Sequence, residues 1–92
     1  MAYLILCEDD VSFVVSDELG AEHRHYLDTR RPLVRAGGPL LGDDGKTIVG
    51  RVMFTVFETR QEAEDFIFNE PFFKHGRVKS HRIQPMIIRI PE

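Results

Sequence analysis

The side chain best suited to acid–base chemistry in this 92-residue chain is His23. It recurs at helical spacing with Leu19, Tyr26 and Leu27, so its imidazole should lie on the apolar side of a helix. An imidazole titrates near neutral pH, and it needs a hydrogen-bond partner wherever it is buried. His23 is therefore either a proton-transferring residue or a structural histidine that meets a carboxylate or a backbone carbonyl.

The other candidate groups do not form a metal, nucleotide or thiol site. His25 lies two positions after His23, and on a helix that spacing turns the two rings apart, so the pair does not predict zinc. Cys7 lies within an apolar run and is expected to be a buried thiol without a catalytic role. The glycines match neither a phosphate-binding loop nor a dinucleotide fingerprint. The sequence thus predicts no cofactor and no metal.

The overall charge also limits the class of partner. The net charge is −3, so the chain lacks the cationic field that binding to a phosphate backbone requires, and nucleic acid is not expected. No apolar run reaches the ~18 residues of a membrane span, so no membrane partner is expected. A single cysteine suits a reducing compartment, which makes a cytoplasmic location the expectation.

Positive and negative charges are separated along the chain. The segment from Pro71 to Pro91 holds five cations and no acid, whereas residues 8–18 hold five acids. The basic segment could be a solvated surface, could attract the acidic segment of a neighbouring molecule, or could attract a small anion.

The elements that must position these groups follow the order β, α, β, β, α, β. The sequence predicts strands at 2–7, 33–36, 47–57 and 78–90, the last interrupted by Pro85, and helices at 16–31 and 59–69. A capping box formed by Thr59 and Glu62 marks the start of the second helix. This order is that of a ferredoxin-like α+β fold, with one antiparallel sheet and two helices on one face. We expect a single domain spanning residues 1–92, with the open sheet face covered in a homodimer.

The strand at 47–57 has one face that is partly polar. Arg51, Met53 and Phe57 lie on this face, which is too apolar for solvent and too polar for a pure core, so it should be a pocket wall or a subunit contact. Arg51 would then attract an anionic group of a ligand or form an ion pair at an interface.

Several short motifs, taken in their order and spacing, resemble a known family. These are Tyr3-Leu4-Ile5-Leu6, His23-x-x-Tyr26-Leu27, Ala36-Gly37-Gly38-Pro39-Leu40, Asp43-Asp44-Gly45, Glu62-Ala63 and Glu70-Pro71-Phe72. On these motifs the chain is similar to the YciI-like, or YCII-related, proteins. The resemblance implies a dimeric α+β barrel with a cleft in each subunit that contains a histidine and an aspartate. It also implies a possible chemistry, because one branch of the family removes chloride from a chlorinated hydroxyhydroquinone.

The resemblance also implies which residues form the site. The family histidine corresponds to His23 and the family aspartate to Glu70, which keeps the carboxylate but adds a methylene and so shifts it by up to ~1.5 Å. These two are the expected catalytic residues. The residues expected to contact a ligand are Tyr26, Gly38, Pro39, Arg51 and Phe72.

A histidine and carboxylate pair suits proton transfer on a small hydroxylated ring or carbonyl compound. Together with the resemblance, this pair predicts a lyase, dehydrochlorinase or isomerase-like reaction on such a compound, and a small anionic or aromatic molecule as the ligand. The alternative is a noncatalytic homodimer for small-ligand binding or protein interaction, in which the same pair only satisfies buried polarity.

Overall fold

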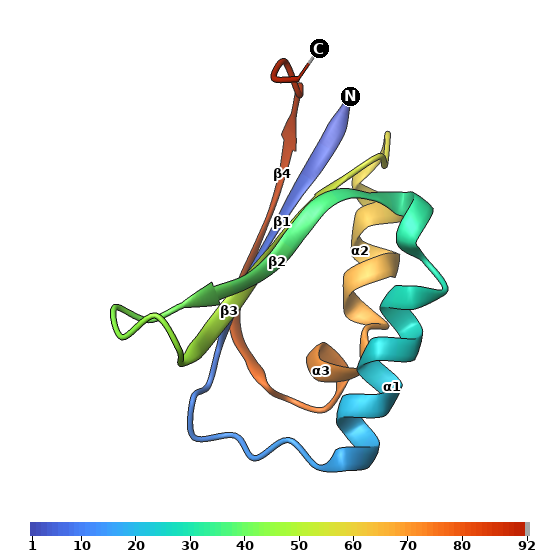
Figure 1. Cartoon of the computed structure of the whole chain (residues 1–92). Coiled ribbons are helices and arrows are strands. Elements are labelled where there is room, and N and C mark those ends of the chain that lie inside the picture. Colours follow the sequence, from blue (N-terminus) through green and yellow to red (C-terminus); the bar gives the residue numbers. More distant parts are fainter. Residues whose placement is uncertain (92) are drawn as a thin grey trace.

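A computed structural model describes residues 1–91 as a four-stranded antiparallel sheet with its helices on one face (Figure 1). In chain order, the elements are β1 (Ala2–Asp9), α1 (Asp17–Asp28), the 3-10 helix η1 (Arg31–Leu33), β2 (Val34–Leu41), β3 (Ile48–Thr55), α2 (Arg60–Phe68), α3 (Pro71–Lys74) and β4 (Val78–Met86). The strands lie in the order β2-β3-β1-β4. This arrangement confirms the predicted ferredoxin-like fold and adds η1 and α3 to it. No helix within residues 1–91 is long and apolar enough to cross a membrane.

Side-chain caps begin both long helices where the sequence predicts them. The Ser16 hydroxyl accepts a hydrogen bond from the backbone N–H of Leu19 at 3.1 Å. Thr59 and Glu62 form the expected capping box at the start of α2. Such caps satisfy backbone N–H groups that have no partner inside the helix. The caps therefore set where α1 and α2 begin.

The edge strands differ from the sequence prediction in length. β2 continues through Gly37, Gly38 and Pro39 to Leu41, because β3 offers it a ladder of hydrogen-bonding partners. A Cβ at Gly37 would lie 2.7 Å from the carbonyl oxygen of Val52, so glycine allows this close pairing. β4 ends at Met86 rather than Ile90. Both strands tolerate a proline because each lies at an edge of the sheet.

The core lies between the sheet and the helices. Tyr3, Ile5 and Cys7 alternate along one face of β1 and pack against Phe66 and Ile67 of α2. The helices cover only this face of the sheet (Figure 1).

The opposite face of the sheet carries half-buried apolar side chains. Leu4 and Leu6 of β1 lie there, paired in register with Phe54 and Val52 of β3. No helix of the described chain covers this second face.

Candidate functional site

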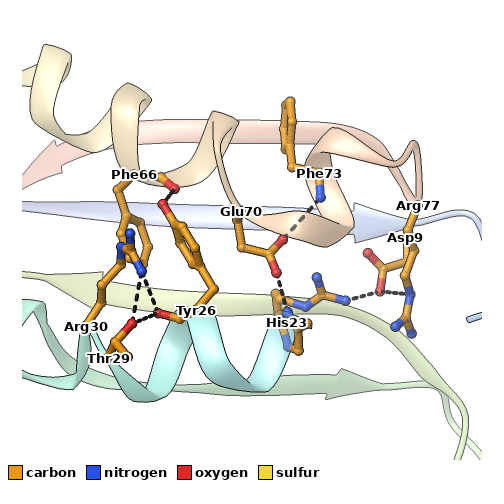
Figure 2. A network of polar contacts seen from close by, with 10 residues as sticks. Asp9, His23, Tyr26, Thr29, Arg30, Phe66, Glu70, Phe73 and Arg77 are labelled. Carbon is orange, nitrogen blue, oxygen red and sulfur yellow. Dashed lines mark hydrogen bonds and ion pairs between the residues drawn. The ribbon is translucent and has the colours of Figure 1, made fainter. Parts of the chain in front are cut away.

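His23 of α1 and Glu70 before α3 are in direct contact. Nδ1 of His23 is hydrogen-bonded to Oε1 of Glu70, as Figure 2 shows. The other carboxylate oxygen, Oε2, accepts the backbone N–H of Phe73 at 3.1 Å. The Glu70 side chain is only 1% exposed and that of His23 is 16% exposed. The carboxylate is thus buried with each oxygen engaged, while the imidazole remains partly accessible.

The sequence Glu70-Pro71 explains why the carboxylate lies where it does. A residue before proline avoids helical angles, and Glu70 adopts an extended conformation with φ −69° and ψ 132°. Pro71 then begins α3, where its missing N–H costs nothing. Glu70 therefore separates α2 from α3 and caps α3 with its own side chain, which turns the carboxylate toward α1.

Phe72 fixes the plane of the imidazole. The rings of His23 and Phe72 stack with centroids 3.8 Å apart and an interplanar angle of 10°. An ionised carboxylate only accepts hydrogen bonds, so the hydrogen shared with Glu70 is assigned to Nδ1 and the lone pair of the ring to Nε2. Nε2 has no hydrogen-bond partner within residues 1–91. This nitrogen is therefore available to a ligand.

A second buried polar cluster adjoins the first and consists of Asp9, Arg51 and Arg77. Oδ2 of Asp9 accepts a hydrogen bond from Nη2 of Arg51 at 2.6 Å and forms an ion pair with Nε of Arg77 at 3.2 Å. Both guanidinium groups lie over the ring of Phe72, at 4.8 and 4.5 Å from its centroid. Burial lowers the pKa of Arg51, and the charge of Asp9 opposes that effect. Phe72 thus links the arginines to the imidazole.

A cavity of about 630 Å³ lies beside both clusters. His23 and Phe72 line it from the helical side, and Arg51 and Met53 line it from β3. Gly38 has no atom within 4 Å of the position a Cβ would take, so this part of β2 leaves the cavity open. A volume of this size falls in the range of small-molecule sites.

Most of the residues predicted for the site meet here. His23 and Glu70 are brought together, and Gly38, Pro39, Arg51 and Phe72 line the cavity. The partly polar face of β3 was predicted to be either a pocket wall or a subunit contact. Its residues Arg51 and Met53 form a wall of the cavity.

Two residues expected near a ligand lie elsewhere. The Tyr26 hydroxyl donates a hydrogen bond to the carbonyl of Phe66 at 2.6 Å (Figure 2). The guanidinium of Arg30 lies over the tyrosine ring, 3.6 Å from its centroid, and Tyr26 does not line the cavity. Burial also raises the pKa of Tyr26. Phe57 packs in the core instead of the cavity wall.

The Asp9 cluster is the part of the site that sequence analysis missed. The sequence places Asp9 in an acidic segment that could meet the basic segment of a neighbouring molecule, but Asp9 is the last residue of β1 and only 1% exposed. It pairs with Arg77 of the basic C-terminal segment within the same chain. The alternation of inward and outward side chains along a strand could have identified Asp9, because Asp9 points to the same face of β1 as the buried Tyr3, Ile5 and Cys7.

Cys7 is buried as expected. Its side chain lies in the core, and burial raises the pKa of the thiol to about 11. A thiol with so high a pKa is a poor nucleophile near neutral pH, which fits a structural role.

Comparison with known proteins agrees with the fold. A sequence model of the YCII-related domain matches residues 1–87, nearly the whole chain. The chain belongs to the YCII-related family. No curated protein matches it in sequence.

The solved structures that are similar to this YCII-related chain include the following two. One is 5-chloro-2-hydroxyhydroquinone dehydrochlorinase from Burkholderia phenoliruptrix in complex with 2,5-dihydroxybenzoquinone, with 26% identity and a TM-score of 0.78 over 95% of this chain and 94% of that one. The other is a protein from Arabidopsis thaliana, with 13% identity and a TM-score of 0.41 over 95% of this chain and 96% of that one. The dehydrochlorinase supports the α+β fold with a four-stranded antiparallel sheet and shows a small quinone bound to a similar structure.

Proposed function

We propose that this YCII-related protein is a small-molecule enzyme in which His23 transfers protons and Glu70 orients it. The observation that carries the proposal is the contact between Nδ1 of His23 and the buried Glu70 carboxylate at the wall of a cavity of about 630 Å³. A carboxylate on one ring nitrogen fixes the tautomer and stabilises the imidazolium that forms when the other nitrogen takes a proton.

The reaction class that this arrangement favours is proton transfer on a small hydroxylated ring or carbonyl compound. In an elimination on a chlorinated hydroquinone, Nε2 of His23 would take the proton of a ring hydroxyl and return it to the chlorinated carbon, which gives the keto tautomer. Loss of the proton of a second hydroxyl would then send an electron pair through the ring and expel chloride from that carbon, so that the net loss is HCl and the product is a quinone. In an isomerisation, the same nitrogen would return the proton to another atom.

Similarity to a dehydrochlorinase at 26% identity makes elimination the first reaction to test. The assay follows chloride release and quinone formation from 5-chloro-2-hydroxyhydroquinone, and the exchange of carbon-bound protons for deuterium in unchlorinated analogues. His23→Ala should lower either rate at least ~100-fold, because a general base contributes about 10²–10⁴-fold. His25→Ala is the matched control, since His25 is exposed on the same helix. Turnover that survives in His23→Ala would remove His23 from the mechanism.

A second proposal concerns assembly. We infer that two copies pack through the open sheet face formed by Leu4, Leu6, Val52 and Phe54, which is half-buried and apolar in the single chain. Burying such a face against its own copy removes apolar surface from water on both partners. Sedimentation analysis should give a dimer for the wild type and a monomer for Phe54→Glu. A monomeric wild type at micromolar concentration would contradict this assembly.

The noncatalytic alternative uses the same cavity. If the protein only binds a ligand, His23→Ala should weaken binding of 2,5-dihydroxybenzoquinone while the wild type shows no turnover or proton exchange with any ring compound in the assay.

A further inference from the structure

The cavity wall is rich in arginine although the chain as a whole is acidic. Five arginines line the cavity, Arg24, Arg31, Arg35, Arg51 and Arg77, together with one acidic residue, Asp28. The net charge of the chain is −3. Positive charge is therefore concentrated at the cavity, although the net charge of the chain is negative.

The carboxylates near these arginines do not neutralise them. Asp28 pairs with Arg31 at 3.0 Å. Asp9 provides one negative charge for both Arg51 and Arg77. The other two lining arginines form no ion pair within residues 1–91. Three positive charges thus remain in excess, and two would remain even with an ionised Glu70 beside a neutral His23.

Arg51 provides a second, independent sign that the polar network is incomplete. Its side chain is only 9% exposed, and its Nη1 is a buried atom with no hydrogen-bond partner in the described chain. Buried polar groups are normally paired, and an unpaired one is costly. Oδ1 of Asp9 is likewise buried without a partner in the described chain, so the cluster keeps one unused donor and one unused acceptor, and the donor belongs to a side chain that lines the cavity.

We propose that the cavity selects substrates that carry an anionic oxygen group, such as a carboxylate or an ionised enol, held by the Arg51–Arg77 pair and attracted by Arg24 and Arg35. The inference rests on the proposed function, since it names the class of substrate for that same site. Asp9 holds the guanidinium groups in place before the ligand arrives, which reduces the ordering that binding would require. A guanidinium offers several parallel N–H donors, a geometry that suits a carboxylate.

The position of the arginines also sets the orientation of the ligand. Both buried guanidinium groups lie over the ring of Phe72, and His23 stacks on that same ring. An anionic group held by the arginines would therefore keep the rest of a small ring within reach of the imidazole.

The test compares two ligands of nearly the same size and shape, the anionic 2,5-dihydroxybenzoate and the neutral 2,5-dihydroxybenzamide, by calorimetry on the whole protein. The acid should bind at least ~10-fold more tightly, because hydrogen bonds to charged groups are stronger than neutral ones. Added salt should weaken binding of the acid and leave that of the amide unchanged. A third ligand, 2,5-dihydroxybenzoquinone, has acidic hydroxyls and no carboxylate, so its binding tests whether an ionised enol can serve as the anionic group.

Variants separate the roles of the residues. Arg35→Gln and Arg24→Gln change exposed side chains, so the fold should persist, and each should weaken the acid about three- to tenfold without affecting the amide. Arg82→Gln is the control, because Arg82 is exposed on β4 and does not line the cavity. Arg51→Gln should have the largest effect if the variant folds.

The outcomes distinguish this inference from the proposed function. Equal affinity for the acid and the amide, or no binding of either the acid or the quinone by the wild type, would overturn the anionic selectivity. His23→Ala should keep the preference for the acid, because the arginines and not the imidazole provide it. A protein that prefers the acid but turns over no compound would refute the enzymatic proposal alone.

Discussion

His23 and Glu70 are hydrogen-bonded although 47 positions separate them in the chain. The contact forms where α1 passes α3, and Glu70 completes it while also capping α3 through Phe73. One buried carboxylate therefore stabilises a helix end and orients the imidazole, so stability and function are coupled at this residue.

Glu70→Ala should destabilise the protein by about 2–4 kcal/mol. The variant loses a helix cap, which is typically worth ~1 kcal/mol, and a hydrogen bond to a charged group, worth about 1.5–3 kcal/mol. Urea unfolding followed by circular dichroism measures the change. Glu58→Ala is the control, because Glu58 is exposed and should alter the free energy of unfolding by less than about 0.5 kcal/mol. Equal stabilities for the two variants would contradict the capping role of Glu70.

Asp9→Asn should also be strongly destabilising. The substitution removes the only negative charge that directly contacts Arg51 and Arg77 in the described chain. Breaking a buried ion pair by removing one partner costs about 3–5 kcal/mol, because the other charge stays buried without compensation. Asp43→Asn, at an exposed turn position, provides the comparison in the same unfolding experiment. A variant of Asp9 as stable as that of Asp43 would show that the cluster is not part of the folded core.

Two glycines should respond to alanine in opposite ways. A Cβ at Gly50 would lie 2.1 Å from the carbonyl oxygen of Cys7, so Gly50→Ala must separate β3 from β1. We expect a loss above about 4 kcal/mol or a failure to fold. Gly38→Ala meets no atom within 4 Å and should change stability by less than ~1 kcal/mol. Thermal unfolding of both variants checks this contrast, which a tolerant Gly50→Ala would disprove.

Cys7 should make the protein less stable in alkali. The thiol has a pKa of about 11 in the folded state against an ordinary value of 9.0, because burial disfavours the thiolate. The folded state thus holds the proton more tightly. This contribution is complete below pH 9.0 and is lost as the pH rises toward about 11.

Unfolding across that pH range, for the wild type and Cys7→Ala, isolates the contribution of the thiol. The stability advantage of the wild type should narrow as the pH rises. If the difference in the free energy of unfolding between the wild type and Cys7→Ala stayed constant with pH, the thiol of Cys7 would have the same pKa in the folded and the unfolded state. Thiol labelling at pH 8 should likewise be slow until the protein is unfolded.

The fold was predictable because its signals are local. Ser16 and the Thr59–Glu62 box begin the helices where the sequence indicates. The length of β2 was not predictable, because a strand extends as far as its partner continues to pair, and that partner is distant in sequence. The glycines and proline within β2 looked like a break, and only the neighbouring β3 makes them a strand.

The site was predictable only in part. Helical spacing put His23 on the inward side of α1, but spacing cannot say which carboxylate an imidazole meets. Glu70 was identified through the family motif. Asp9 was missed because it stands beside two other acids, Glu8 and Asp10, and the three resemble a solvated loop. The alternation of β1 distinguishes them, since Glu8 and Asp10 are exposed while Asp9 is buried.

The most direct test of the His23–Glu70 pair is NMR of the protein with ¹⁵N-labelled histidine rings, with and without 2,5-dihydroxybenzoquinone. We predict that neutral His23 carries its hydrogen on Nδ1, and that the ligand shifts the Nε2 resonance of His23 while His25 stays unchanged. A hydrogen on Nε2 instead, or a His23 resonance that does not respond to saturating ligand, would contradict the account.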